Sequence, residues 1–145
     1  MRSHYEIRSS LDALAARLAA ARVADSDLSA KDVKVAGQAI IAKGRKAIEN
    51  KKVKEMIRQD IAFHSYVYAI SGNELIATSA ELHWRFLRRV MGDVLRHAQR
   101  PPSIWDQHDA ILNAIAAGNE ELAERLAAEH IQQACSRLTK ALEMT

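Results

Sequence analysis

The chemically informative residues of this chain are one aspartate and three histidines that fall among apolar residues. Asp60 and His64 are four residues apart, so a helix places them one turn apart on the same face. His108 and His130 lie on two later segments, each inside an apolar repeat of helical period. An unpaired buried carboxylate costs several kcal/mol or more, and an unsatisfied imidazole costs roughly 1–3 kcal/mol. Four such groups directed inward therefore need a common partner.

A divalent metal ion is a partner that satisfies all four groups together. Imidazole nitrogens and a carboxylate oxygen bind zinc and its transition-metal neighbours at about 2.0–2.2 Å. The spacing leaves an alternative open, in which Asp60 hydrogen-bonds His64 along the helix and the other two histidines have ordinary core partners. Competing ligand candidates lie on the apolar face of another predicted helix: Ser79, His83, Asp93 and His97.

Six predicted helices position these side chains. They span about residues 4–22, 27–49, 51–70, 74–98 and 103–118, and the last runs from Asn119 nearly to the C-terminus. The cluster Asp25-Ser26-Asp27 is the predicted boundary of the first two helices, and Ser71-Gly72-Asn73 separates the third from the fourth. Ser103 and Asn119 are predicted to cap the last two helices. No segment alternates with a period of two, so the sequence predicts an all-α fold.

Length and composition restrict the class of protein. A chain of 145 residues forms one domain, and its 26 alanines, five glycines and two prolines favour helices with few interruptions. A hydrophobic content of 48% is typical of a globular protein and excludes a disordered one. No apolar run approaches the roughly 18 residues of a membrane span, and the single Cys135 excludes an internal disulfide. We therefore expect a cytoplasmic protein that makes no membrane contact.

A set of motifs in a fixed order spans nearly the whole chain. It comprises Asp60-x3-His64, Ser71-Gly72-Asn73, His108 heading His-Asp-Ala-Ile-Leu-Asn-Ala-Ile, Gly118-Asn119, and His130. Glu6-Ile7-Arg8-Ser9-Ser10-Leu11-Asp12, which continues into the segment Leu14–Ala20, forms the opening helix. Together these motifs resemble the FCD domain, the C-terminal effector-binding domain of the FadR subfamily of GntR transcriptional regulators. Asp12 stands where that family usually has glutamate.

The resemblance implies an antiparallel helical bundle, usually dimeric, that encloses a metal ion and a small organic acid. By position, the family's metal ligands carry over onto Asp60, His64, His108 and His130. Zinc is favoured, and nickel and manganese accept the same ligand set. The resemblance further implies that the domain is not an enzyme, and that an effector bound inside it changes the affinity of an attached domain for DNA.

A carboxylate effector also follows from the charge of such a centre. One carboxylate and three neutral imidazoles leave a divalent ion with a net charge near +1, which attracts an anion in a low-dielectric interior. A guanidinium is a suitable second anchor because its planar fork pairs with a carboxylate through two hydrogen bonds. Arg8 and Arg89 lie beside apolar helix faces and are the candidate anchors. The alternative for each is a surface arginine whose stem covers apolar residues.

The domain organisation departs from that of the family. GntR regulators carry a winged helix-turn-helix domain before this one, whereas Met1 here lies almost directly before the first helix. Residues 1–145 are either a single FCD-like domain excised from a regulator or a natural protein without a DNA reader. We favour the excised domain, with DNA bound only through the missing reader. Two other functions stay open: a metal-dependent hydrolase, for which Asp93 is the remaining inward carboxylate, and a helical interaction module with a structural metal.

Overall fold

The computed structural model describes residues 2–94 and 101–143, which form six helices and the short segments between them. The helices are α1 (Arg2–Ala24), α2 (Ala30–Glu49), α3 (Val53–Ser71), α4 (Glu74–Val94), α5 (Ser103–Ala116) and α6 (Glu120–Glu143). The described residues contain no strand, so the predicted all-α fold is confirmed. Within the same ranges, no helix has both the length and the apolar content that a membrane crossing requires.

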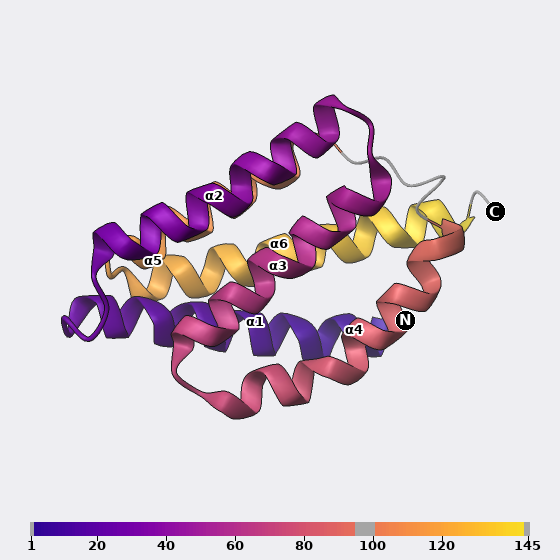
Figure 1. Ribbon diagram of the computed structural model, residues 1–145. Coiled ribbons are helices and arrows are strands. Elements are labelled where there is room, and N and C mark those ends of the chain that lie inside the picture. Colours follow the sequence, from indigo (N-terminus) through magenta and orange to yellow (C-terminus); the bar gives the residue numbers. More distant parts are fainter. Residues whose placement is uncertain (1, 95–100, 144–145) are drawn as a thin grey trace.

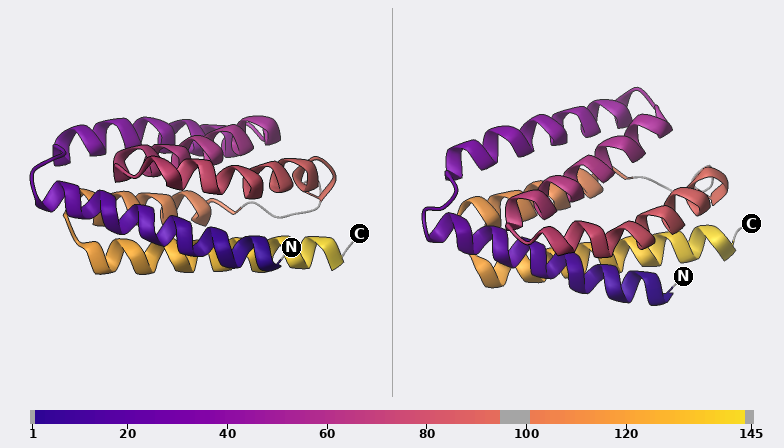
Figure 2. Two further views of the ribbon diagram at one scale, coloured as in Figure 1. Left: turned by 90° about the horizontal axis from the view of Figure 1, so that it is seen from below. Right: turned by 60° about the horizontal axis from the view of Figure 1, so that its bottom comes forward.

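The helices pack as an antiparallel bundle in which α1 is central. It contacts α3, α4, α5 and α6. Figure 1 shows α1 and α6 running in opposite directions, so that α1 begins and α6 ends at the same end of the bundle. Figure 2 shows α6 on one side of α1, with the α2–α3 pair on the other. Side chains of α3, α5 and α6 can therefore meet in the interior beside α1.

Small residues bring α1 and α6 close together. Ala15, Ala16 and Ala19 of α1 are fully buried, and Ala123 and Ala127 of α6 are almost completely buried. An alanine adds no more than a methyl group to the interface, so the two backbones approach closely along their length. Bulkier residues of the other helices complete the core: Ile41, Phe63, Leu87, Trp105, Leu112, Ile115 and Ile131. The core is therefore packed on both sides of α1, the helix that also carries Arg8 and Asp12.

The boundary between α1 and α2 differs from the predicted one. The N–H groups of Asp27 and Leu28 donate to the carbonyl of Arg22 at 2.8 and 3.2 Å, so these residues close the end of α1. Ser26 has a positive φ of 63° and forms part of the turn. The N-cap of α2 is Ser29, whose hydroxyl accepts from the N–H of Asp32. Residues 25–27 therefore follow the end of α1, as predicted, but α2 begins at Ala30 and not near residue 27.

Of the other predicted boundaries, two are confirmed and one is wrong. Gly72 has the left-handed φ of 81° expected after a helix, and the Asn73 side chain accepts from the N–H of Leu75. The Asn119 side chain likewise accepts from a backbone N–H in the first turn of α6. Ser103, in contrast, is the first helical residue of α5 and not its N-cap. The cap position is occupied by Pro102, whose carbonyl accepts from the Trp105 N–H.

Gly44 allows α2 to lie against the Trp105 ring. A Cβ atom at residue 44 would be 2.1 Å from this rigid ring, whereas one at Gly37 would lie 2.5 Å from a methyl group of the smaller Leu112 side chain. We expect Gly44→Ala to lower the free energy of unfolding by about 1–3 kcal/mol, the range typical of overpacking. Gly37→Ala, the matched control, should cost clearly less. Urea denaturation of both variants measures the difference, and equal stabilities would contradict the expectation.

Candidate metal centre

Three helices bring the four predicted ligands to one place in the bundle. Asp60 and His64 lie one turn apart on α3, while His108 is on α5 and His130 is on α6. The three histidines are at most 4% exposed. One candidate ligand atom from each of the four residues lies within 4.8 Å of the other three. The predicted convergence of these side chains is therefore confirmed.

The distances in this cluster fit a metal ion. Oδ1 of Asp60 lies 3.6 Å from Nε2 of His64 and 3.2 Å from Nε2 of His108. Nε2 of His108 lies 3.1 Å from Nε2 of His130. Ligand atoms about 2.1 Å from one ion are roughly 3.0–3.4 Å apart at coordination angles of about 90–109°. In addition, Nε2 of His64 is buried without a hydrogen-bond partner among the described residues, which is costly unless another group binds it.

The charge states of the cluster also favour a cation. Burial lowers the pKa of His108 to about 4, although the carboxylate of Asp60 opposes this shift. Burial, and then the nearby His108 and His64, hold the pKa of His130 well below its usual value. Burial raises the pKa of Asp60, but the nearby His108 and His64 rings outweigh it and hold that pKa well below its usual range. At neutral pH, the cluster therefore presents a carboxylate and the lone pairs of two neutral imidazoles.

Asp12 positions His64. Nδ1 of His64 lies within ion-pair distance of Oδ2 of Asp12, at 2.8 Å, and Nε2 lies on the side of Asp60, at 3.6 Å from its Oδ1. The hydroxyl of Tyr68 donates to Oδ1 of Asp12 and accepts from Nε1 of Trp84 at 3.3 Å. Burial lowers the pKa of His64, but the carboxylates of Asp12 and Asp60 outweigh it and raise that pKa. A carboxylate on the second ring nitrogen is the usual support of a metal-binding histidine.

Gln107 positions His130 in a similar way. Its Oε1 lies 2.6 Å from Nδ1 of His130, which directs Nε2 of that ring toward the cluster. Its amide nitrogen donates to Oε1 of Gln133 at 2.6 Å, which holds the Gln107 side chain in place. The His108 ring is held by packing, since it stacks on Phe63 with ring centroids 4.3 Å apart. Sequence analysis missed the role of Gln107, because no spacing rule connects residues on α5 and α6.

We expect Gln107→Ala to weaken metal binding about 10–100-fold, the usual effect of removing a residue that supports a ligand. Without the amide oxygen, nothing holds the hydrogen on Nδ1 of His130 or fixes the orientation of the ring. Nε2 can then carry the hydrogen and lose the lone pair that would bind the ion. A competition titration of the metal-free protein against a chromophoric chelator measures the affinity. The control is Gln38→Ala, which removes an exposed glutamine that bonds Asp109. An affinity for Gln107→Ala equal to that of the control would exclude the positioning role.

The two arginines predicted as effector anchors lie in different environments. Arg8 is 2% exposed, and its guanidinium carbon lies 4.1 Å from the centre of the Trp84 ring. Its Nε has no hydrogen-bond partner among the described residues. Burial alone would lower the pKa of Arg8, but the Asp12 carboxylate and other nearby groups outweigh this effect and raise that pKa. The side chain therefore stays charged. Arg89, in contrast, is exposed. It lines a surface pocket with Leu82, Arg85 and Arg88.

Two of the competing ligand candidates, His83 and Ser79, are described by the structure, and neither belongs to the cluster of Asp60, His64, His108 and His130. His83 is buried on α4, but its Nδ1 lies 2.9 Å from Nδ1 of His4. Ser79 is exposed. His97 and the side chain of Asp93 lie outside the described residues. Within residues 2–94 and 101–143, the group of potential ligands close enough to hold one ion is the set from α3, α5 and α6.

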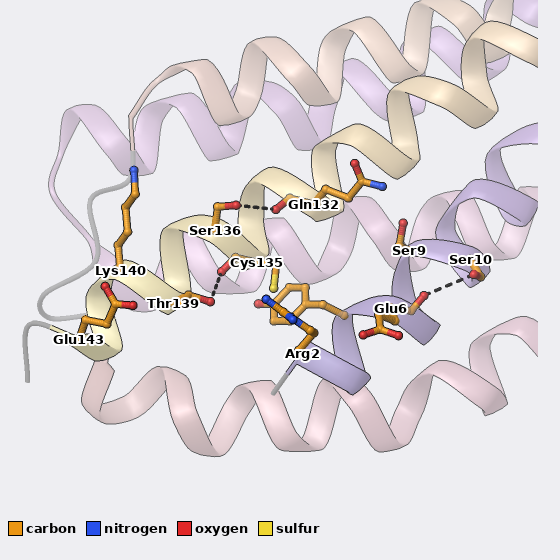
Figure 3. Close-up of a pocket in the computed structure, with 11 residues that line it drawn as sticks. Arg2, Glu6, Ser9, Ser10, Gln132, Cys135, Ser136, Thr139, Lys140 and Glu143 are labelled. Atoms are coloured by element: carbon orange, nitrogen blue, oxygen red, sulfur yellow. Dashed lines mark hydrogen bonds between the residues drawn. The ribbon is translucent and has the colours of Figure 1, made fainter.

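A groove between the start of α1 and the end of α6 is distinct from this cluster (Figure 3). It is lined by Arg2, Tyr5, Glu6, Ser9, Ser10, Gln132, Cys135, Ser136, Thr139, Lys140 and Glu143. The hydroxyls of Ser136 and Thr139 donate to carbonyls of their own helix at 3.2 and 2.8 Å. None of the four candidate ligands lines the groove, so it is not part of the candidate metal centre.

Comparisons with known proteins support the same domain type. The FCD domain family matches residues 3–133 of the chain. Among solved structures, that of E. coli McbR/YncC is similar, with a TM-score of 0.83 and 19% sequence identity. The similarity covers 96% of this chain and 64% of that one, so this chain spans a little under two thirds of the length of McbR/YncC. A comparison with curated protein sequences gives no match. At this identity, the structural likeness establishes the fold alone.

Proposed function

Because the chain belongs to the FCD domain family, the effector-binding domains of GntR-type regulators, we propose that it senses a small carboxylate with the help of a divalent metal ion. Asp60, His64, His108 and His130 hold the ion in this proposal, with zinc favoured over nickel and manganese. The ion supplies open coordination positions and residual positive charge for a carboxylate oxygen. An attached winged helix-turn-helix domain would register binding as a change in affinity for DNA. The homodimer implied by the resemblance stays a prediction.

One observation carries this proposal: four donor atoms from three helices meet in the buried interior within 4.8 Å of one another. Such a set is unfavourable on its own, since it brings a carboxylate and three ring nitrogens out of water. Asp12 and Gln107 each hold a histidine with its Nε2 toward the others. A divalent cation satisfies all of these groups at once.

Arg8 is the proposed second anchor for the carboxylate. Its positive charge helps to lower the pKa values of the buried His108 and His130, and its side chain is itself buried. The Trp84 ring holds the guanidinium through a cation–π contact, and Nε lacks a hydrogen-bond partner among the described residues. A carboxylate between the guanidinium and the ion would supply acceptors to one and a ligand to the other.

The test is binding of small carboxylates to metal-loaded protein. We expect isothermal titration with a panel of organic acids to give saturable binding to the Zn²⁺-loaded chain and none after dialysis against a chelator. Acid binding that persists without the metal, or metal-loaded protein that binds no acid, would contradict the proposal. Because thermal shift responds to any ligand of the folded state, it provides a rapid first screen of the same panel.

Replacing Arg8 should then weaken the binding of the acid. We expect Arg8→Gln to raise the dissociation constant of the identified acid about 10–100-fold, the usual effect of losing a hydrogen-bonded charge partner. Arg89→Gln removes an exposed arginine of α4 and is the matched control, for which we expect no change. If the control variant loses binding and Arg8→Gln keeps it, the anchor is Arg89 instead.

An enzymatic function has less physical support. Hydrolysis at a metal centre needs a free general base beside the ion. Among the described side chains, the second inward carboxylate is Asp12, which accepts a hydrogen bond from Tyr68 and lies within ion-pair distance of His64. FCD domains are regulatory domains. Turnover of an ester, amide or phosphate by the metal-loaded chain would favour a hydrolase, and metal binding without acid binding would favour a structural metal.

A further inference from the structure

The charges around the cluster determine how much negative charge an effector can bring. Asp60 shifts the pKa of all three histidines, Asp12 shifts that of His64, and Arg8 shifts those of His108 and His130. The carboxylate of Asp12 and the guanidinium of Arg8 carry opposite charges, and both side chains are buried. The remaining carboxylate, on Asp60, neutralises one of the two charges of a divalent ion. Among the described residues, the loaded centre therefore has a net charge of one positive unit.

We propose that this centre selects small monocarboxylates and discriminates against dicarboxylates, an inference that rests on the sensing function proposed above. One carboxylate neutralises the loaded centre. A second would leave an unpaired negative charge in a buried site, where the cost of unpaired charge is high because water does not screen it.

The cavity beside His64 offers no cationic side chain that could bind a second carboxylate of the effector. The Tyr68 hydroxyl donates to Asp12, so its hydrogen is already used. Burial, followed by the charge of Asp12, raises the pKa of Tyr68, so this side chain remains neutral. The cavity beside His64 is otherwise lined by apolar residues: Ala16, Phe63, Val67, Ile111 and Ala127. These side chains favour a short apolar remainder on the effector over a second charged group.

Of the candidate ligands, only His64 lines this cavity, which is small. It offers about 10 Å³ of free space, which is roughly the space that one water molecule needs. Every additional carbon of the effector must displace side chains that are packed in the core, which costs free energy. We therefore expect affinity to fall as the chain of the acid lengthens beyond a few carbons.

Pairs of acids with the same number of carbons test the charge rule directly. Calorimetric titrations of the Zn²⁺-loaded chain would compare propionate with malonate and butyrate with succinate, in a buffer without carboxylates. We expect each monocarboxylate to bind at least about tenfold more tightly than its dicarboxylate partner. Metal analysis after each titration checks that the dicarboxylate has not removed the ion. Equal or tighter binding of the dicarboxylates would overturn the inference while leaving the sensing function intact. If neither class binds, the sensing function and this inference both fail.

Asp12→Asn changes the charge of the site at nearly constant shape. The variant raises the net charge of the loaded centre by one unit, and the amide oxygen can still accept from His64. At saturating Zn²⁺, we expect the preference for monocarboxylates to disappear or reverse. The control is Asp106→Asn, which removes an exposed carboxylate paired with Arg45 and should leave the preference unchanged. A preference in Asp12→Asn equal to that of the control would show that charge balance does not set the selectivity. Should the variant fail to fold, the comparison of acids in the unmodified chain still decides the question.

Discussion

His130→Ala is expected to weaken metal binding at least about 100-fold. Loss of a residue that merely supports a ligand commonly costs 10–100-fold in affinity, and His130 would itself donate to the ion. Its Nε2 lies 3.1 Å from Nε2 of His108, and it brings the ligand that connects α6 to the centre. Competition between the metal-free protein and a chromophoric chelator for Zn²⁺ gives the dissociation constant. The same titration reports stoichiometry, for which we expect one ion per chain in the unmodified protein.

His83→Ala is the matched control for this experiment. His83 is also a buried histidine, but it lies on α4 and contacts His4 instead of the cluster. Both variants remove an imidazole from the interior, so both should lower the stability of the metal-free protein. Only His130→Ala should lose the affinity for metal. If the two variants bind Zn²⁺ equally, the cluster of α3, α5 and α6 is not the metal centre.

Removing the metal should lower the thermal stability of the unmodified chain by about 8–16 °C at a free metal concentration 1,000 times the dissociation constant. A ligand at that excess stabilises the folded state by about 4 kcal/mol, and each kcal/mol shifts the melting temperature of a domain of about this size by about 2–4 °C. The ion would connect α3, α5 and α6, so unfolding any of them releases it. Calorimetry before and after dialysis against a chelator measures the shift. Identical melting temperatures would mean that no ion binds to the folded state.

The stabilisation by metal should decrease as the pH falls toward 6.5. Asp12 and Asp60 raise the pKa of His64 despite its burial. In the metal-free protein, this shift contributes stability that is present below the unfolded-state pKa of about 6.5 and is lost as the pH rises through the folded pKa. The metal-bound form instead requires His64 to be deprotonated. The difference in melting temperature between the two forms should therefore be larger at pH 8.5 than at pH 6.5, and a constant difference would contradict the assignment of His64.

Local sequence patterns sufficed to predict most of the helices. A Gly with positive φ after α3 and an Asn cap before α6 depend on only a few neighbouring residues, so they are readable from the chain itself. The start of α2 was predicted about three residues too early, because Asp27 and Leu28 bond back to Arg22 in the turn after α1 and the cap is Ser29. Such hydrogen bonds compete with capping, and the spacing of polar residues does not indicate which will form.

The sequence by itself determined that Asp60, His64, His108 and His130 face inward, because the helical period assigns each residue to the apolar or the polar side of its own helix. It did not determine that Asp12 supports His64, that Gln107 supports His130, or that Arg8 is buried while Arg89 is exposed. These relations join residues of different helices, and they depend on the distances and rotations that packing imposes. Only the tertiary structure decides them, because contacts between helices are set by how whole faces interdigitate and not by the order of residues along the chain.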